Sequence, residues 1–178
     1  MNHLELRLSG SGGQGLITAG IILAEAALLD GKNAIQSQSY GPEARGGASK
    51  AEVIISGDDI DFPKVQAPDL VLALTQVASD KYLTSVKEDG IVVVDDKIEL
   101  PADLKAKKIV KVPILRTATD VIGKSIVANI IALGLIAELT GAASKESVEK
   151  AVLSRVPKGT EELNKAALEE GFKLAQNQ

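Results

Sequence analysis

The opening of the chain constrains its fold more than any other stretch. Leu4–Leu8 alternates apolar and polar residues, which predicts a strand, and Gly10–Gly15 then forms a glycine-rich loop. Leu16–Leu29 is rich in Ala, Ile and Leu and stops just before Gly31, as a helix with a C-terminal glycine does. Asn33–Gln38 predicts a second strand. Strand, loop, helix and strand make a βαβ unit, for which we expect a right-handed crossover.

The rest of the chain predicts further strands and a helical end. Strand patterns lie at Lys50–Ser56, Leu70–Leu74, Ile91–Asp95 and Lys108–Leu115, and helical patterns at Thr75–Val86, Asp120–Thr140, Lys145–Val156 and Glu161–Gln176. Ser144 is a candidate N-cap, and Leu168, Phe172 and Ala175 fall on one face of the last helix. With 178 residues and four aromatics, we expect one α/β domain over residues 1–178, with a mostly parallel sheet covered on both faces and a helical C-terminal third.

Composition excludes several kinds of chemistry. The chain has no Cys, and its one His is His3, beside the N-terminus. Iron–sulfur ligation by its own thiolates, Cys-based zinc sites, disulfides and a Cys nucleophile are therefore excluded, and a Ser-His-Asp triad would have to recruit His3. We predict no catalytic residue and no metal ligand in this chain.

Charge and hydropathy limit the partners and the cellular location that we expect for this chain. The net charge is −4 and no basic run with interleaved aromatics occurs, which argues against a nucleic-acid partner. The N-terminus reads directly into a strand, with no signal-peptide pattern, so we expect a cytoplasmic protein. The most apolar stretch, Ile126–Ala137, is far shorter than the roughly 20 residues of a membrane span. We therefore expect no membrane association.

The glycine loop matches G-x-G-x-x-G at Gly10, Gly12 and Gly15, between a predicted strand and a predicted helix. Glycines allow a tight turn there, and a phosphate can approach free N–H groups at the positive end of the helix. The alternative is that the glycines only let the helix pack closely on the strand. A dinucleotide site also needs an Asp or Glu at the end of the next strand, and Ile35–Gln38 supplies none. A self-contained NAD-binding domain is disfavoured, but another phosphate-bearing ligand is not.

Residues 118–125 resemble a P-loop whose first Gly is replaced by Ala, and Ile91–Asp95 could pass for a Walker B strand. However, Val121 and Ile122 would crowd a loop whose amides must wrap phosphates, and only helices follow. We interpret Gly123–Ser125 as the first turn of a long helix.

A second loop, Tyr40–Gly47, follows the second predicted strand, at the edge of an α/β sheet where ligands usually bind. Arg45 could clamp a phosphate or carboxylate, or pair across a subunit interface. Equally, Arg45 could merely tie its own loop to Glu43.

Together these segments resemble the gamma subunit, or gamma domain, of 2-oxoacid:ferredoxin oxidoreductases. The resemblance covers nearly the whole chain, and its motifs are Ser9–Gly15, Ala19–Ala27, Ser39–Gly47, Leu72–Gln76, the helix that bears Asn129, and Pro157–Asn164. It implies a Rossmann-like three-layer fold. The C-terminal pattern is closer to the 2-oxoglutarate type than to the pyruvate type.

The resemblance also implies a function. The family decarboxylates a 2-oxoacid oxidatively to an acyl-CoA with thiamine diphosphate and magnesium, and passes two electrons through iron–sulfur clusters to ferredoxin. Those cofactors would lie on partner alpha, beta and ferredoxin-like delta subunits, and this chain would contribute coenzyme A binding and assembly. A CoA pyrophosphate would meet backbone N–H groups of the glycine loop, with cofactor-binding residues Ser11, Gly12, Gly13, Gln14, Gly15, Tyr40 and Arg45.

Two other functions stay open at this point. One is an assembly subunit that binds no ligand, in which the glycine loop only packs. The other is a free-standing oxidoreductase that binds NAD or a flavin. The sequence alone does not identify the 2-oxoacid, the subunit composition or a homo-oligomeric state.

Overall fold

The computed structural model of the chain describes residues 2–39 and 47–178. These residues form a six-stranded sheet of order β2-β3-β1-β4-β5-β6. The strands are β1 (His3–Ser11), β2 (Asn33–Gln38), β3 (Ala48–Ser56), β4 (Leu70–Ala73), β5 (Ile91–Asp95) and β6 (Lys108–Val112). β1, β4, β5 and β6 run parallel, whereas β3 is antiparallel to both of its neighbours, β1 and β2. The predicted mostly parallel α/β sheet is confirmed.

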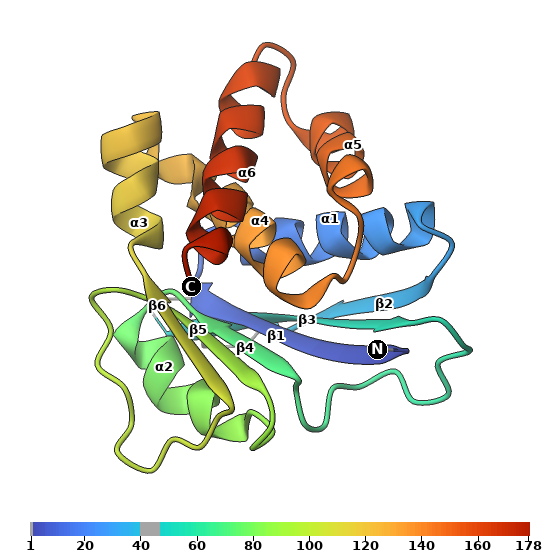
Figure 1. Ribbon diagram of the computed structural model, residues 1–178, viewed down its shortest axis with the longest axis vertical. Coiled ribbons are helices and arrows are strands. Elements are labelled where there is room, and N and C mark those ends of the chain that lie inside the picture. Colours follow the sequence, from blue (N-terminus) through green and yellow to red (C-terminus); the bar gives the residue numbers. More distant parts are fainter. Residues whose placement is uncertain (1, 40–46) are drawn as a thin grey trace.

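Helices cover both faces of the sheet (Figure 1). On one face lie α1 (Leu16–Leu29), α4 (Ala128–Thr140), α5 (Lys145–Arg155) and α6 (Glu161–Gln176), and on the other lies α2 (Gln76–Tyr82), continued by the short turn η2 (Leu83–Ser85). The predicted three layers and the helical C-terminal third are both present. None of the helices in the described residues combines the length and the apolar character that a bilayer crossing requires.

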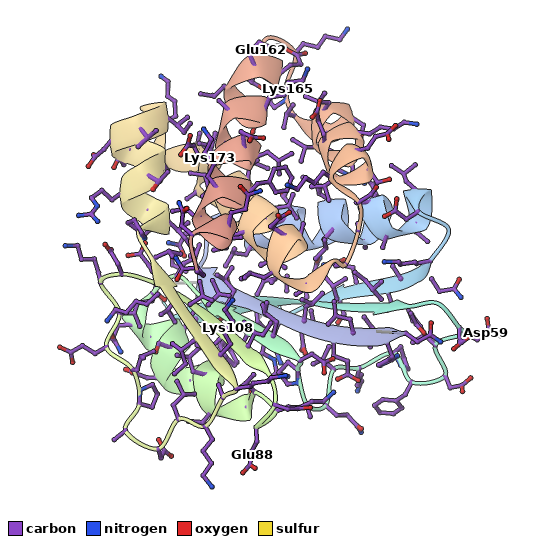
Figure 2. All side chains as sticks on the ribbon, viewed as in Figure 1. Asp59, Glu88, Lys108, Glu162, Lys165 and Lys173 are labelled. Carbon is purple, nitrogen blue, oxygen red and sulfur yellow. The ribbon has the colours of Figure 1, made fainter. Side chains whose placement is uncertain are left out.

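Strand alternation divides the core between the two faces. In β1, Leu4, Leu6 and Leu8 pack beneath the layer of α1, α4, α5 and α6. β4 and β5 are buried on both faces, and Val71 and Val92 contact the smaller cluster around α2. Figure 2 labels six charged side chains that are exposed or half-exposed, namely Asp59, Glu88, Lys108, Glu162, Lys165 and Lys173. Burial of aliphatic residues on both faces explains the low aromatic content.

Helices α4 and α6 cross at two glycines. A Cβ atom added to Gly134 would lie 2.5 Å from the carbonyl oxygen of Leu168, and one added to Gly171 would lie closer still to the carbonyl oxygen of Ile131. Both contacts are with backbone, which cannot rotate away. The predicted apolar face of α6 therefore packs directly on α4, and Phe172 is 5% exposed.

The βαβ prediction needs one correction. β1, α1 and β2 follow each other as predicted, but β2 does not lie beside β1, because β3 occupies the place between them. All nine residues of β3 pair with β1, from Ala48 opposite Ser11 to Ser56 opposite His3. The chain thus turns back after β2 and fills the gap. This long-range pairing has no signature in local periodicity.

The prediction of one helix from Asp120 to Thr140 is wrong. A short α-helical turn, α3 (Ile114–Arg116), continues into a π-helical turn, η3 (Thr117–Ile122), which ends at Gly123 with φ 84°. Lys124 is extended, and η4 (Ser125–Val127) then leads into α4. Gly123 acts as a left-handed C-cap, so it ends a helix rather than starting one. The lysine and serine that follow belong to a connection, not to a first helical turn.

Smaller differences concern strand and helix ends. The last strand ends at Val112 rather than Leu115, because Pro113 is followed at once by α3. Thr75 is the N-cap of α2, and its hydroxyl accepts the Ala78 N–H at 3.2 Å. Ser144 caps α5 as predicted, and its hydroxyl accepts the Ser147 N–H at 3.2 Å.

Candidate phosphate-binding site

The glycine loop is a short turn between β1 and α1. β1 extends through Gly10 and Ser11, because both residues pair with β3, so the turn itself begins at Gly12. The side chain of Gln14 closes the turn from inside: its Oε1 accepts the Ser11 N–H at 2.8 Å. This oxygen lies where a Cβ atom of residue 10 would be. A side chain at Gly10 would therefore displace Gln14 from the turn.

Gly13 and Gly15 serve a different purpose. Their φ angles are +87° and +74°, in the left-handed region that favours glycine, and a Cβ atom on Gly13 would meet no atom within 4 Å. Gly15 is the N-cap of α1, with no side-chain hydrogen bond at the cap and no acidic residue in the first turn. Among the described residues, nothing accepts a hydrogen bond from the N–H of Gly13 or Gly15. Within residues 2–39 and 47–178, no group therefore compensates the positive end of α1.

A cavity of about 400 Å³ opens over this turn. We call it the glycine-loop cavity, and its described lining residues are Ser11, Gly12, Gly13, Gly15, Leu16, Ile17, Ser39 and Ser49. Four of the predicted site residues thus lie around one cavity, while Gln14 lies behind the turn. The arrangement is able to hold an anion by backbone N–H groups at a helix N-terminus.

The residues on either side of the second predicted loop line the same cavity. Ser39 follows β2 and Ser49 is the second residue of β3, and both line the cavity. The reason is topological: β3 runs antiparallel between β1 and β2, so its start meets the ends of both. Tyr40 and Arg45 themselves lie outside the described residues.

Asn129 is the contact that sequence reasoning missed. This second residue of α4 donates a hydrogen bond from Nδ2 to the carbonyl oxygen of Gly15 at 3.2 Å. The signals in the sequence were an amide near the start of a mostly apolar helix and the place of that helix in the family resemblance. The partner, 114 positions away in the chain, could not be deduced from it.

The described residues lack two things that other functions would need. No carboxylate lies among the described residues that line the cavity, and β2 ends with Gln36 hydrogen-bonded to Gln38 at 3.0 Å. A ribose-binding acid is therefore missing at the position where a dinucleotide site requires one. In addition, no group of three or more metal-ligating side chains is found within residues 2–39 and 47–178.

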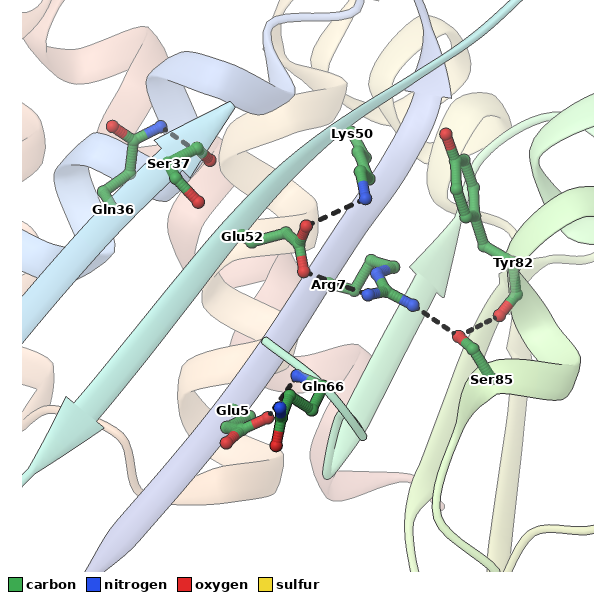
Figure 3. A network of polar contacts seen from close by, with 9 residues as sticks. All are labelled: Glu5, Arg7, Gln36, Ser37, Lys50, Glu52, Gln66, Tyr82 and Ser85. Carbon is green, nitrogen blue, oxygen red and sulfur yellow. Dashed lines mark hydrogen bonds and ion pairs between the residues drawn. The ribbon is translucent and has the colours of Figure 1, made fainter. Parts of the chain in front are cut away.

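A second polar cluster lies on the α2 side of the sheet (Figure 3). Arg7 of β1 donates to Ser85 at 2.7 Å and to Glu52 of β3 at 3.0 Å, and Glu52 also pairs with Lys50 at 2.9 Å. The side chains of Arg7 and Glu52 are only 10% and 12% exposed. Strand alternation predicts these residues on the polar side but not their burial. The cluster joins β1, β3 and η2 and takes no part in lining the glycine-loop cavity.

Known proteins resemble this chain over nearly its whole length. The family model for pyruvate ferredoxin/flavodoxin oxidoreductase matches residues 5–174. The 2-oxoglutarate synthase subunit KorC of Methanocaldococcus jannaschii is 52% identical over 174 residues, covering 96% of this chain and 93% of the relative.

Solved structures show the same resemblance. The keto/oxoacid ferredoxin oxidoreductase gamma subunit of Geobacter sulfurreducens superposes with a TM-score of 0.90 at 50% identity, covering 99% of this chain and 98% of that one. The 2-oxoglutarate:ferredoxin oxidoreductase of Magnetococcus marinus, solved with 2-oxoglutarate, coenzyme A and succinyl-CoA, has the same fold at 20% identity, with a TM-score of 0.86. There, all of this chain matches 32% of a longer one. The chain therefore belongs to the pyruvate ferredoxin/flavodoxin oxidoreductase family, and it is a gamma-type subunit of that family.

Proposed function

We propose that this chain, as one gamma-type domain over residues 1–178, binds the pyrophosphate of coenzyme A in a 2-oxoglutarate:ferredoxin oxidoreductase complex. The observation that carries the proposal is the turn at Gly12–Gly15, which lines a cavity at the start of α1 and whose Gly13 and Gly15 N–H groups have no acceptor among the described residues. A pyrophosphate accepts hydrogen bonds from such groups and is favoured by the helix dipole. The cavity takes the phosphate end of coenzyme A rather than the whole molecule.

The rest of the cofactor chemistry belongs to partners. The chain has no Cys, so its residues do not fit an iron–sulfur cluster. We assign thiamine diphosphate, magnesium and the clusters to alpha, beta and ferredoxin-like delta subunits, with ferredoxin as electron acceptor. When bound, coenzyme A supplies the thiol that accepts the acyl group. This chain's own residues bind and orient the phosphates: Ser11, Gly12, Gly13 and Gly15 line the cavity, Gln14 holds the turn from behind, and Tyr40 and Arg45 join them from the second loop. The cytoplasmic location stays a prediction.

The substrate assignment rests on the relatives. The KorC relatives carry the name 2-oxoglutarate synthase, at 52% to 39% identity. We therefore expect the purified anaerobic complex to reduce ferredoxin with 2-oxoglutarate and coenzyme A. Pyruvate and branched 2-oxoacids serve as the comparison, and a higher kcat/KM with either would contradict the assignment.

The coenzyme A assignment is tested by Gly13→Val in the assembled complex. A valine there should obstruct the approach of a phosphate, so we expect the KM for coenzyme A to rise at least tenfold, with steps that depend only on the 2-oxoacid unchanged. Gly31→Val is the matched control, because Gly31 has φ +78° and open space around it, but lies at the other end of α1. It imposes similar strain without touching the cavity.

Arg45→Ala is expected to weaken coenzyme A binding by about 1 to 3 kcal/mol if its guanidinium contacts a phosphate. Unchanged coenzyme A kinetics in both Gly13→Val and Arg45→Ala, in normally assembled complexes, would instead support the subunit whose role is assembly. The free-standing oxidoreductase predicts NAD or flavin binding by the isolated chain, and the missing acid after β2 opposes it.

A further inference from the structure

The glycine-loop turn is supported by one side chain from a distant helix. The carbonyl oxygen of Gly15 accepts two hydrogen bonds: the first helical bond of α1, from the Ala19 N–H at 3.0 Å, and the bond from Asn129 Nδ2 at 3.2 Å. In a trans peptide the C=O and N–H bonds point in opposite directions. Fixing the carbonyl of Gly15 therefore also fixes the N–H of Leu16, which points away from the helix at its N-terminal end.

The side-chain amide of Asn129 also lies close to the turn. A Cβ atom on Gly15 would lie 2.6 Å from Nδ2 of Asn129 and 3.0 Å from its Cγ. The φ of +74° favours glycine at residue 15, and a Cβ atom there would in addition require Asn129 to move. The side chain thus holds the turn by a hydrogen bond and by direct packing.

The placement of Asn129 makes this support rigid. It sits in the first turn of α4, a helix buried along most of its length and locked to α6 through Gly134. Residues on a packed helix hold a geometry more precisely than residues on a loop. The turn itself has few other internal bonds: one from the Gln14 N–H to the Ser11 carbonyl at 3.3 Å, and the Gln14 side-chain contact.

We propose that Asn129 is a positioning residue, which sets the orientation of the Gly15–Leu16 peptide so that the N–H groups of the turn converge on one anion. It does not touch the ligand; it acts through the turn. The inference rests on the proposed binding of a coenzyme A pyrophosphate in the glycine-loop cavity, and it names the residue that organises that site.

A first experiment reads the turn without any ligand. In the ¹⁵N-labelled isolated chain, Asn129→Ala should shift the backbone amide resonances of Gly13, Gly15 and Leu16 and speed their hydrogen exchange. Asn164→Ala is the matched control: Asn164 is another inward-facing amide, 6% exposed, whose Nδ2 donates to the Thr160 carbonyl at 2.9 Å instead. Turn resonances that respond no more to Asn129→Ala than to Asn164→Ala would overturn the proposal.

A second experiment uses the assembled complex. We expect Asn129→Ala and the isosteric Asn129→Asp to raise the KM for coenzyme A about fivefold, the value of one lost hydrogen bond, with kcat unchanged at saturating coenzyme A. Asn164→Ala should leave this KM unchanged. If Gly13→Val raises the KM while both Asn129 variants do not, the positioning role is wrong and coenzyme A binding stands. If none of these variants changes the KM, the coenzyme A assignment itself is contradicted, and the positioning role of Asn129 with it.

Discussion

Two regions of this molecule depend on glycine for opposite reasons. At the crossing of α4 and α6, Gly134 and Gly171 are required because there is no room: any Cβ atom would collide with backbone of the other helix. In the turn before α1, Gly13 is required although a Cβ atom there would have open space, because its φ is +87°. One region uses glycine for close packing of two helices, and the other uses it for a left-handed backbone conformation.

The comparison teaches that a glycine pattern has no single meaning. Within the motif of residues 10–15, Gly10 makes room for the side chain of Gln14, whereas Gly13 and Gly15 adopt left-handed conformations. Gly15 combines both reasons, since Asn129 fills the space beside it. Within one loop, close packing therefore accounts for Gly10, whereas a left-handed conformation accounts for Gly13 and Gly15.

The largest expected effect is at the helix crossing. Gly171→Ala should destabilise the isolated chain by about 3 kcal/mol, because the helices must move apart to admit the methyl group. This loss is opposed by the better helix propensity of Ala, about 1 kcal/mol. Urea unfolding measures the difference, and Ala166→Gly, at an exposed position of the same helix, should cost only that propensity. If Gly171→Ala left the free energy of unfolding unchanged, the close packing of α4 against α6 would be contradicted.

Next in size is an alanine in the turn. Gly15→Ala should cost about 2 kcal/mol, from left-handed strain and from the contact with Asn129, whereas Gly13→Ala should cost about 1 kcal/mol, from strain alone. A double-mutant cycle of Gly15→Ala with Asn129→Ala isolates the contact. If the two changes in the free energy of unfolding were additive in that cycle, Asn129 would not contact the side chain at residue 15.

The sequence predicted regular elements well where one local pattern decides them. Ile91–Asp95 and Glu161–Gln176 have the predicted bounds, because a continuous apolar run and a single amphipathic face each leave one solution. Gly123 was misassigned because the same tripeptide fits a helix start and a helix end, and only φ distinguishes them.

Contacts between residues far apart in the sequence could not be predicted from local patterns. The insertion of β3 between β1 and β2 depends on pairing between residues about 45 positions apart, and the support of Gly15 by Asn129 spans most of the chain. The turn could be predicted because it is a local motif, and its contact with Asn129 could not, because that contact is not local.

The smallest expected effect concerns pH, at the end of α1 opposite the turn. Burial raises the pKa of Asp30, but hydrogen bonds from the Ser147 hydroxyl and from the N–H and hydroxyl of Ser144 outweigh this and hold the pKa below its ordinary value of 3.8. A lowered folded-state pKa stabilises the fold above that value, and the stabilisation is lost as pH falls through the folded-state pKa. Because Asp30 is exposed, we expect less than about 1 kcal/mol. Asp30→Asn should remove this part of the acid dependence of urea unfolding, and an identical acid profile would contradict it.

We propose that the open turn, unlike the closed helix crossing, holds a ligand. Cryo-electron microscopy of the anaerobic complex with coenzyme A can locate that ligand. We expect the pyrophosphate of coenzyme A within hydrogen-bond distance of the backbone N–H groups of Gly12, Gly13 and Gly15. A coenzyme A bound with its pyrophosphate on another subunit, and nothing against this turn, would contradict it.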